Sequence, residues 1–170
     1  MMSDTLQSIL QKQQKPKLDD LILTFRSHMN TLPFVEVARN TSVNDLQSSD
    51  SKKEKDFKTF PLGAPAQVKA AITYNRYLRK FKLDKIHEPI RDGAKIKWTQ
   101  LKKNELDIHT MALKGYDDPP ALVEFVATHM DYDWLYEKEL KNKLQDFYDA
   151  LNWGLLPTEI NQSASKWFSF

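Results

Sequence analysis

The chain has 170 residues, 41% of them hydrophobic, which is enough to form one ordinary core. Lysine and arginine (25) nearly balance aspartate and glutamate (23), so a surface that attracts nucleic acid must be local. The absence of cysteine excludes disulfides and cysteine-bound zinc, and it favours the cytoplasm over a secreted location.

The first part of the chain predicts one helix and little other buried structure. Residues 1–17 are polar and predict a mobile lead-in or a short frayed helix. Apolar residues at helical spacing predict an amphipathic helix over about residues 18–28, and residues 34–38 predict a short strand. Residues 40–60 are rich in serine, asparagine, aspartate and lysine, so they predict a long exposed loop that buries almost nothing.

The middle of the chain predicts a second helix and a small sheet. Pro61 and Pro65 precede this helix, which covers about residues 66–82 and can turn apolar residues toward a core. Residues 95–98 alternate with period two behind the turn signal Asp92-Gly93, which is typical of a half-buried strand. Residues 107–113 are its predicted partner strand.

The last part of the chain predicts two further helices. Two prolines after an aspartate turn lead into a third helix over about residues 121–130. Apolar residues at 4,3,4 spacing predict another helix, which starts near Asp133 and is stopped by Gly154 and Pro157. We therefore predict a predominantly helical α+β fold with a small antiparallel β element, a single domain over residues 18–160 and a tail over residues 161–170.

The second predicted helix and the turn before it carry a run of positive charge. Residues 63–82 contain no acid and these cations: Lys69, Arg76, Arg79, Lys80 and Lys82. Contacts to phosphates dominate DNA affinity and carry no sequence preference, so such a face suits duplex binding. The alternative is a solvated basic face without a ligand, which is the usual role of a charge run.

The order of short motifs along the chain gives a family resemblance. From about Asp19 to its end, the chain resembles the thumb, the C-terminal part, of family B replicative DNA polymerases of T-even-like bacteriophages. The motifs that carry the resemblance are residues 34–38, 44–46, 71–76, 90–96 and 130–138. In that family the thumb is a mostly helical domain that grips the primer–template duplex and ends in a peptide that binds the sliding clamp.

The resemblance implies two groups of DNA-binding residues. The first lies on the second predicted helix and comprises Lys69, Tyr74, Asn75, Arg76 and Arg79, with Lys80 beside them. The second comprises Lys138, Lys141 and Lys143, although the aligned position itself is Asn142 here. Residues 102–105 depart from the apolar, glycine-rich loop of the family, so contacts of that loop are not carried over.

The C-terminal tail carries three aromatic residues among serines. An extended tail can insert such side chains into an apolar groove of a partner, and the position resembles the clamp-binding end of the family. The implied clamp-binding residues are Lys166, Trp167, Phe168 and Phe170. The alternative is that these aromatics fold back onto their own domain.

The sequence contains no recognisable catalytic or metal site. The four histidines lack metal-ligand spacing, and Asp131 and Asp133 suit the start of a helix better than a metal pair. The palm carboxylates, nucleotide-binding lysines and exonuclease acids of a polymerase have no counterparts. We therefore expect a non-catalytic part of a DNA-directed DNA polymerase, with Mg²⁺ held by a separate catalytic chain.

These observations give the expected partners and setting. Because the chain starts Met-Met-Ser, we expect the smaller product of a split polymerase gene, or an expressed thumb fragment. Its expected partners are the catalytic chain, primer–template DNA and a sliding clamp, in the cytoplasm of the infected bacterial host. No apolar run approaches the roughly 20 residues of a membrane span, so we expect no membrane partner. The rival hypothesis is a free-standing adaptor with an aromatic binding peptide.

Overall fold

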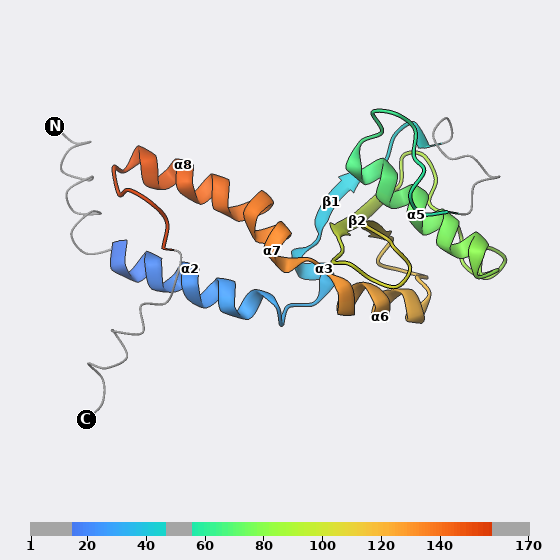
Figure 1. Cartoon of the computed structure of the whole chain (residues 1–170), viewed down its shortest axis with the longest axis horizontal. Coiled ribbons are helices and arrows are strands. Elements are labelled where there is room, and N and C mark those ends of the chain that lie inside the picture. The colour runs from blue at the N-terminus through green and yellow to red at the C-terminus, as the bar shows by residue number, and fades with distance from the viewer. Residues whose placement is uncertain (1–14, 47–55, 158–170) are drawn as a thin grey trace, which may run out of the picture. The chain divides into compact units, whose positions relative to one another are not determined.

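The computed structural model describes residues 15–46 and 56–157 (Figure 1). The chain divides into two compact units, whereas the sequence predicts one domain over residues 18–160. Unit 1 combines the residues up to Leu32 with those from Tyr136 onward, and unit 2 runs from Pro33 to Leu135. Helices predominate and the strands form a small antiparallel sheet, which confirms the predicted α+β class.

The sheet of unit 2 has the order β1-β2-β3, and all its pairings are antiparallel. Its strands are β1 (Arg39–Ser42), β2 (Lys95–Gln100) and β3 (Thr110–Leu113). The predicted pairing of β2 with a later strand is confirmed, but β3 begins at Thr110 rather than at residue 107. The Asn104 side chain bonds both backbone groups of Ile108, at 2.7 and 3.1 Å, and so ties the preceding residues into a loop.

Helix α5 (Ala66–Lys80) is the central helix of unit 2 and confirms the second predicted helix. It packs mainly against β3, and every residue from Ala70 to Leu78 is buried. Helix α6 (Pro120–His129) has proline at its start, as predicted. Figure 1 shows α5 and α6 on opposite sides of β2.

The strand predicted at residues 34–38 is wrong. The structure has a helical turn there, α3 (Phe34–Val37), and the strand β1 follows it. The Glu36 N–H donates to the Pro33 carbonyl at 2.9 Å and the Ala38 N–H donates to the Phe34 carbonyl at 2.9 Å. These local bonds satisfy the backbone of the apolar run without a neighbouring strand.

The segment predicted as an exposed loop contributes to the core. Within residues 40–60, Val43, Leu46 and Phe57 are buried. Val43 exchanges backbone hydrogen bonds with the turn before β2, because its N–H donates to Ala94 and its carbonyl accepts from Gly93. The segment is polar on average, so its composition did not predict that these few apolar residues pack into the core. Residues 47–55 lie outside the described part.

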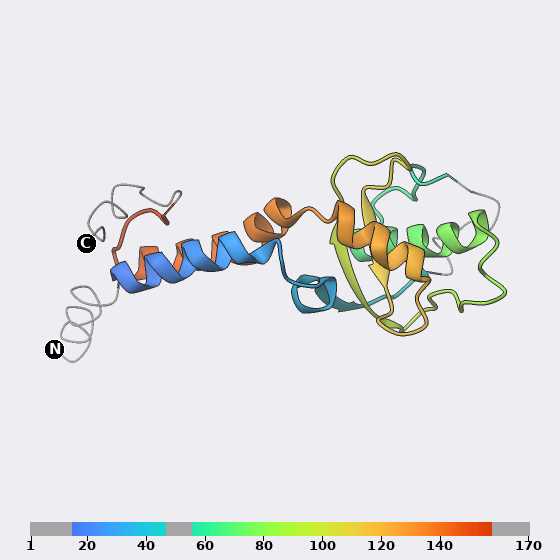
Figure 2. The same cartoon turned by 90° about the horizontal axis from the view of Figure 1, so that it is seen from below.

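Unit 1 is built from α2 (Lys15–Met29), the π-helical turn η1 (Tyr136–Lys141) and α8 (Asn142–Ala150). Figures 1 and 2 show α2 and α8 side by side. Their core consists of Ile22, Tyr148 and Leu156, against which Leu18, Leu144 and Trp153 pack.

The limits of the last helical stretch differ in part from the prediction. α7 (Tyr132–Leu135) starts beside Asp133, and Asp131 caps it by accepting the Trp134 N–H at 2.9 Å. α8 ends at Ala150, before Gly154, because Asn152 takes a left-handed conformation with φ of 54°. Among the described helices, none is both long and apolar enough to cross a membrane.

Candidate nucleic-acid interface

The motif at the centre of α5 lies inside unit 2. Tyr74, Asn75 and Arg76 are all buried, with exposed fractions of 0%, 5% and 0%. The resemblance implies phosphate contacts for these three residues, but a side chain without solvent exposure cannot reach a phosphate in this structure. In this structure the three side chains have a role inside the fold, and their direct contact with DNA stays a prediction.

The Arg76 guanidinium is held by the chain segment just before α5. Its Nη1 donates to the carbonyls of Asp56 and Thr59, at 3.0 and 2.6 Å. The carboxylate of Asp56 lies 4.0 Å away, and the Phe60 ring centre is 5.2 Å from the guanidinium carbon. A buried charge requires such partners, so Arg76 fixes residues 56–60 against the helix.

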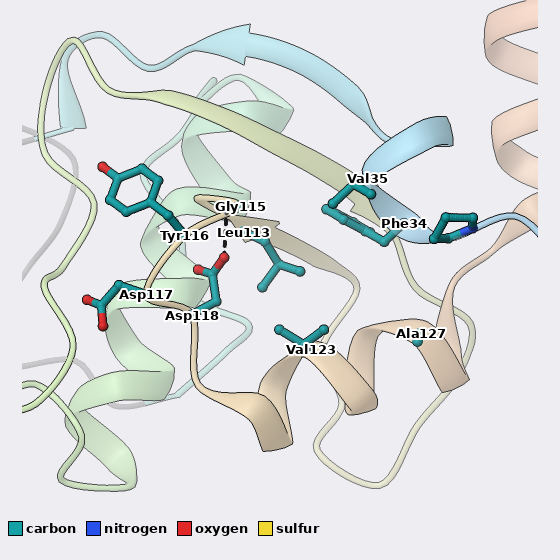
Figure 3. Close-up of a pocket in the computed structure, with 10 residues that line it drawn as sticks. Phe34, Val35, Leu113, Gly115, Tyr116, Asp117, Asp118, Val123 and Ala127 are labelled. Carbon is teal, nitrogen blue, oxygen red and sulfur yellow. Dashed lines mark hydrogen bonds between the residues drawn. The ribbon is translucent and has the colours of Figure 1, made fainter.

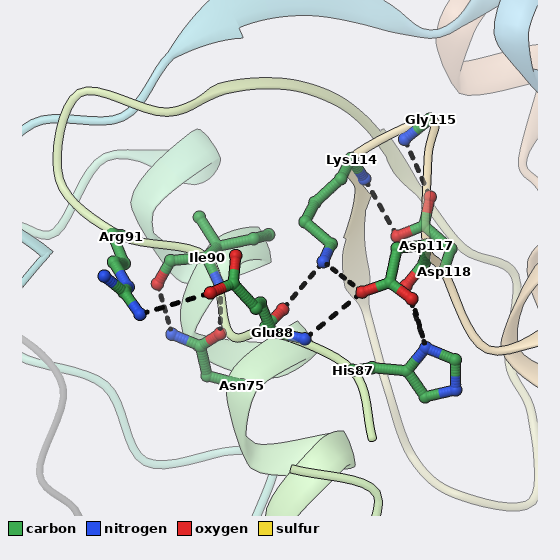
Figure 4. A network of polar contacts seen from close by, with 9 residues as sticks. All are labelled: Asn75, His87, Glu88, Ile90, Arg91, Lys114, Gly115, Asp117 and Asp118. Atoms are coloured by element: carbon green, nitrogen blue, oxygen red, sulfur yellow. Dashed lines mark hydrogen bonds and ion pairs between the residues drawn. The ribbon is translucent and has the colours of Figure 1, made fainter. Parts of the chain in front are cut away.

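Asn75 joins α5 to the segment before β2. Its Oδ1 accepts the Ile90 N–H at 2.8 Å, and its Nδ2 donates to the Ile90 carbonyl at 3.0 Å (Figure 4). The amide side chain thereby satisfies both backbone groups of a buried residue outside any strand. The motifs at residues 71–76 and 90–96 are thus physically connected.

Tyr74 is the third buried residue of the α5 motif. Desolvation by burial raises the pKa of its hydroxyl, and the nearby Asp118 carboxylate raises it further. The Lys114 amine lies 5.8 Å from the centre of the Tyr74 ring. Tyr74 is therefore a neutral core residue over the whole physiological pH range.

The other cations of α5 lie toward its ends. Lys69 is half-buried in the first turns and Arg79 is half-buried in the last turn, whereas Lys80, the last residue of α5, and Lys82, just beyond the helix, are exposed. The Lys80 amine also lies 4.7 Å from the centre of the Phe57 ring. Cations in the last turn complement the helix dipole, so the positive charge at this end of α5 has a structural explanation, and its contact with phosphates stays a prediction.

The second predicted group of lysines belongs to unit 1 and is partly neutralised. Lys141 bonds Glu137 at 2.7 Å and Lys143 lies 4.0 Å from Glu139, each one helical turn away. Lys138 is exposed. The expected clamp-binding residues, Lys166 to Phe170, lie outside the described residues.

A polar network holds the turn after β3 in unit 2 (Figure 4). The Lys114 side chain is only 4% exposed. Its amine donates to the Glu88 carbonyl at 2.8 Å and to the Asp117 carboxylate at 3.3 Å. Asp117 also accepts the Glu88 N–H at 3.3 Å and lies 3.1 Å from His87 Nδ1. The backbone bond from Glu88 is the largest cause that lowers the pKa of Asp117, followed by Lys114 and His87.

An apolar pocket of about 470 Å³ opens beside this turn (Figure 3). Its apolar lining consists of Pro33, Phe34, Val35, Leu113, Val123 and Ala127 together with the ring of Tyr116. The Asp118 carboxylate at its edge accepts the N–H groups of Lys114 and Gly115, at 3.0 and 2.7 Å. Because the carboxylate is satisfied by its own turn, the pocket suits an apolar group.

A second pocket, of about 450 Å³, lies on the sheet and is lined by Asn40, Thr41, Ser42, Lys95, Ile96, Lys97 and Lys114. No acid is among these residues. Local sequence patterns do not point to this site, because β1 is polar and nothing in its sequence shows which strand it joins. The one local signal for this site was the alternation of Lys95 and Lys97 in β2, which places both lysines on the same face of the strand.

Within the part of the chain that the structure describes, no three histidine, aspartate or glutamate side chains form a group suited to a metal ion. No protein-family model matches the chain, and a search of the curated proteins gives no match. The resemblance to polymerase thumbs therefore depends on the motifs of the chain itself.

Proposed function

We propose that the chain is the thumb portion of a phage family B DNA polymerase. In this role it grips the primer–template duplex through phosphates, binds a larger catalytic chain that holds Mg²⁺, and tethers the enzyme to a sliding clamp through its C-terminal residues. It is a non-catalytic part of the nucleotidyltransferase and works in the cytoplasm of the infected bacterium.

The ordered succession of five short motifs carries this proposal. The bonds between Asn75 and Ile90 support it, because they give a physical reason for two of the motifs to occur together. A shared fold does not by itself establish a shared activity, so the function is inferred by analogy with the family.

The proposed gain is processivity. Phosphate contacts slow dissociation from any sequence, and a tail bound to a clamp raises the effective concentration of the enzyme at the duplex. Either attachment then keeps the other within reach after a momentary release.

The test is capture of the tagged full chain from phage-infected cells, with mass spectrometry of the bound proteins. We expect a larger chain with exonuclease and palm motifs, together with a ring-shaped clamp. A matched chain that lacks residues 167–170 should retain the catalytic chain and lose the clamp. Recovery of neither protein contradicts the proposal.

The alternative function is a free-standing adaptor, and the apolar pocket favours it. Exposed side chains on its rim, Val35 (47%) and Tyr116 (66%), are suited to contact another protein. The two functions differ in their response to DNA. An adaptor shows no salt-dependent binding of duplex, whereas a thumb binds duplexes of any sequence.

A further inference from the structure

We propose that unit 2 contacts the phosphodiester backbone of DNA through the sheet rather than through the motif of α5. The site is the β1–β2 polar face, which we define as Asn40, Ser42, Lys95 and Lys97. The inference rests on the proposed function, because it names the surface that would hold the duplex. Neither lysine of this face was among the expected DNA-binding residues.

The strand register places these four side chains together. Asn40 pairs with Lys97 and Ser42 pairs with Lys95 across the antiparallel ladder. Residues two apart on a strand point to the same face, and directly opposed side chains have Cβ atoms about 4.5–5.5 Å apart. Two lysines, an amide and a hydroxyl therefore share one side of a two-stranded surface, beside a pocket of about 450 Å³.

The positive charge of this face is not neutralised within the described chain. Lys95 is exposed and Lys97 is half-buried, and neither forms an ion pair in residues 15–46 and 56–157. The Lys97 amine donates to the Val35 carbonyl, which fixes its position and leaves two of its three hydrogens for a ligand. Lys114, the third lysine of the pocket, is instead occupied by Asp117 and Glu88.

The small polar side chains supply the remaining donors. Asn40 and Ser42 are exposed, and neither side chain has a hydrogen-bond partner among the described residues. An amide and a hydroxyl beside two ammonium groups form a set that can donate to several oxygens at once. Phosphates present such oxygens, and contacts of this kind position a duplex without reading its sequence.

The β1–β2 polar face fits a duplex better than the α5 motif does. The three motif side chains of α5 are buried, and the exposed lysines Lys80 and Lys82 lie at the end of α5 and just beyond it, at the negative end of the helix dipole. Strands in a sheet instead present lysines from a rigid surface at fixed spacing. An acidic peptide is the competing ligand, and the test below separates it from DNA.

The experiment measures binding of a fluorescent primer–template duplex to the full chain by anisotropy, over a range of salt concentrations. The test variant is Lys95→Gln with Lys97→Gln. The matched control is Lys102→Gln with Lys103→Gln, which removes the same charge from exposed positions of unit 2. Each phosphate contact contributes nearly one unit to the log–log salt slope, so the slope should fall by about 2 for the test variant only.

The outcomes separate the inference from the proposed function. A loss of affinity of about tenfold or more in the test variant alone supports both. Equal binding by all three proteins overturns the inference and leaves the proposed function standing. Absence of duplex binding by the unmodified chain at low salt overturns both. Displacement of the duplex by an acidic peptide at equal charge concentration assigns the face to a protein partner and also overturns the inference.

A second measurement does not depend on the folding of a variant. Lysine acetylation of the unmodified chain, with and without duplex, reports which amines DNA covers. We expect protection of Lys95 by duplex but not by the same concentration of inorganic phosphate, with Lys102 unprotected in both. Equal modification of Lys95 with and without duplex contradicts the inference, whatever the variants show.

Discussion

The side-chain amide of Asn75 forms hydrogen bonds with both backbone groups of Ile90, at 2.8 and 3.0 Å, in the buried interior of unit 2. A single residue of α5 thereby replaces the strand partner that Ile90 lacks. Both groups would be buried and unsatisfied without it, which makes Asn75 a determinant of stability.

We predict that Asn75→Ala destabilises the chain by about 2–4 kcal/mol, since two buried backbone groups lose their partners. Urea denaturation followed by circular dichroism measures the change. The control, Lys85→Ala, alters an exposed residue of the same unit and should change stability by about 0.5 kcal/mol or less. A change below about 1 kcal/mol for Asn75→Ala would show that water satisfies Ile90.

Arg76 should also act through stability. Arg76→Met removes the donor to the carbonyls of Asp56 and Thr59, and we expect a loss of about 2–4 kcal/mol. At temperatures where the variant is fully folded, its affinity for duplex DNA should equal that of the unmodified chain.

Arg76→Lys provides the matched control, because it keeps the charge and loses the two-carbonyl geometry. It should be destabilised in the same direction. If a folded Arg76→Met chain binds duplex much more weakly, with a reduced salt slope, Arg76 reaches phosphates after all.

Local patterns in the sequence predicted the helices and strands better than they predicted which segments pack around each of them. The apolar residues of α5 gave its limits almost to the residue, because helical spacing is a local property. The same spacing marks only the side of a helix that faces the main core. It could not show that residues 56–60 and the segment around Ile90 cover the other side, so it gave no warning that Tyr74 to Arg76, which the resemblance implies as DNA contacts, are buried.

The polar face of the sheet was hidden for a related reason. Ser42 and Lys95 are neighbours through a pairing between segments about fifty positions apart, and no local signal specifies that register. β1 lacks the apolar alternation that identifies a half-buried strand. Sites composed of residues from separate strands therefore appear only once the pairing is known.

Asp117 should make the stability of unit 2 depend on pH. Its pKa is lowered in the folded chain, first by the Glu88 N–H and then by Lys114 and His87. A depressed carboxyl pKa stabilises the folded state above the unfolded value of about 3.9, and this stabilisation is lost as the pH falls through the folded pKa. We therefore expect the urea midpoint of the unmodified chain to fall more steeply below about pH 4 than that of Asp117→Asn.

The variant suits this test because asparagine tolerates the left-handed backbone that Asp117 adopts, with φ of 52°. Asp84→Asn changes an exposed carboxylate of the same unit and serves as the control. Parallel acid limbs for Asp117→Asn and the unmodified chain would show that this carboxylate does not contribute.

In unit 1, Tyr148 links α8 to α2. Its side chain is fully buried, its hydroxyl donates to the carboxylate of Asp19, and its ring lies 5.4 Å from that of Trp153 in an edge contact. Tyr148→Phe keeps the ring and removes one hydrogen bond to a charged acceptor, so we expect a loss of about 1–3 kcal/mol. Tyr148→Ala also opens a cavity and should cost about 3–5 kcal/mol.

Amide hydrogen exchange localises the effect of these two variants. Because Asp19 lies on α2, Tyr148→Phe should speed exchange of the α2 amides and leave those of α5 unchanged. Asp146→Ala, at an exposed position of α8, provides the control and should change neither helix. Equal acceleration in α2 and α5 would instead mean that the two units unfold as one, and the stability of unit 1 would then include that of the sheet.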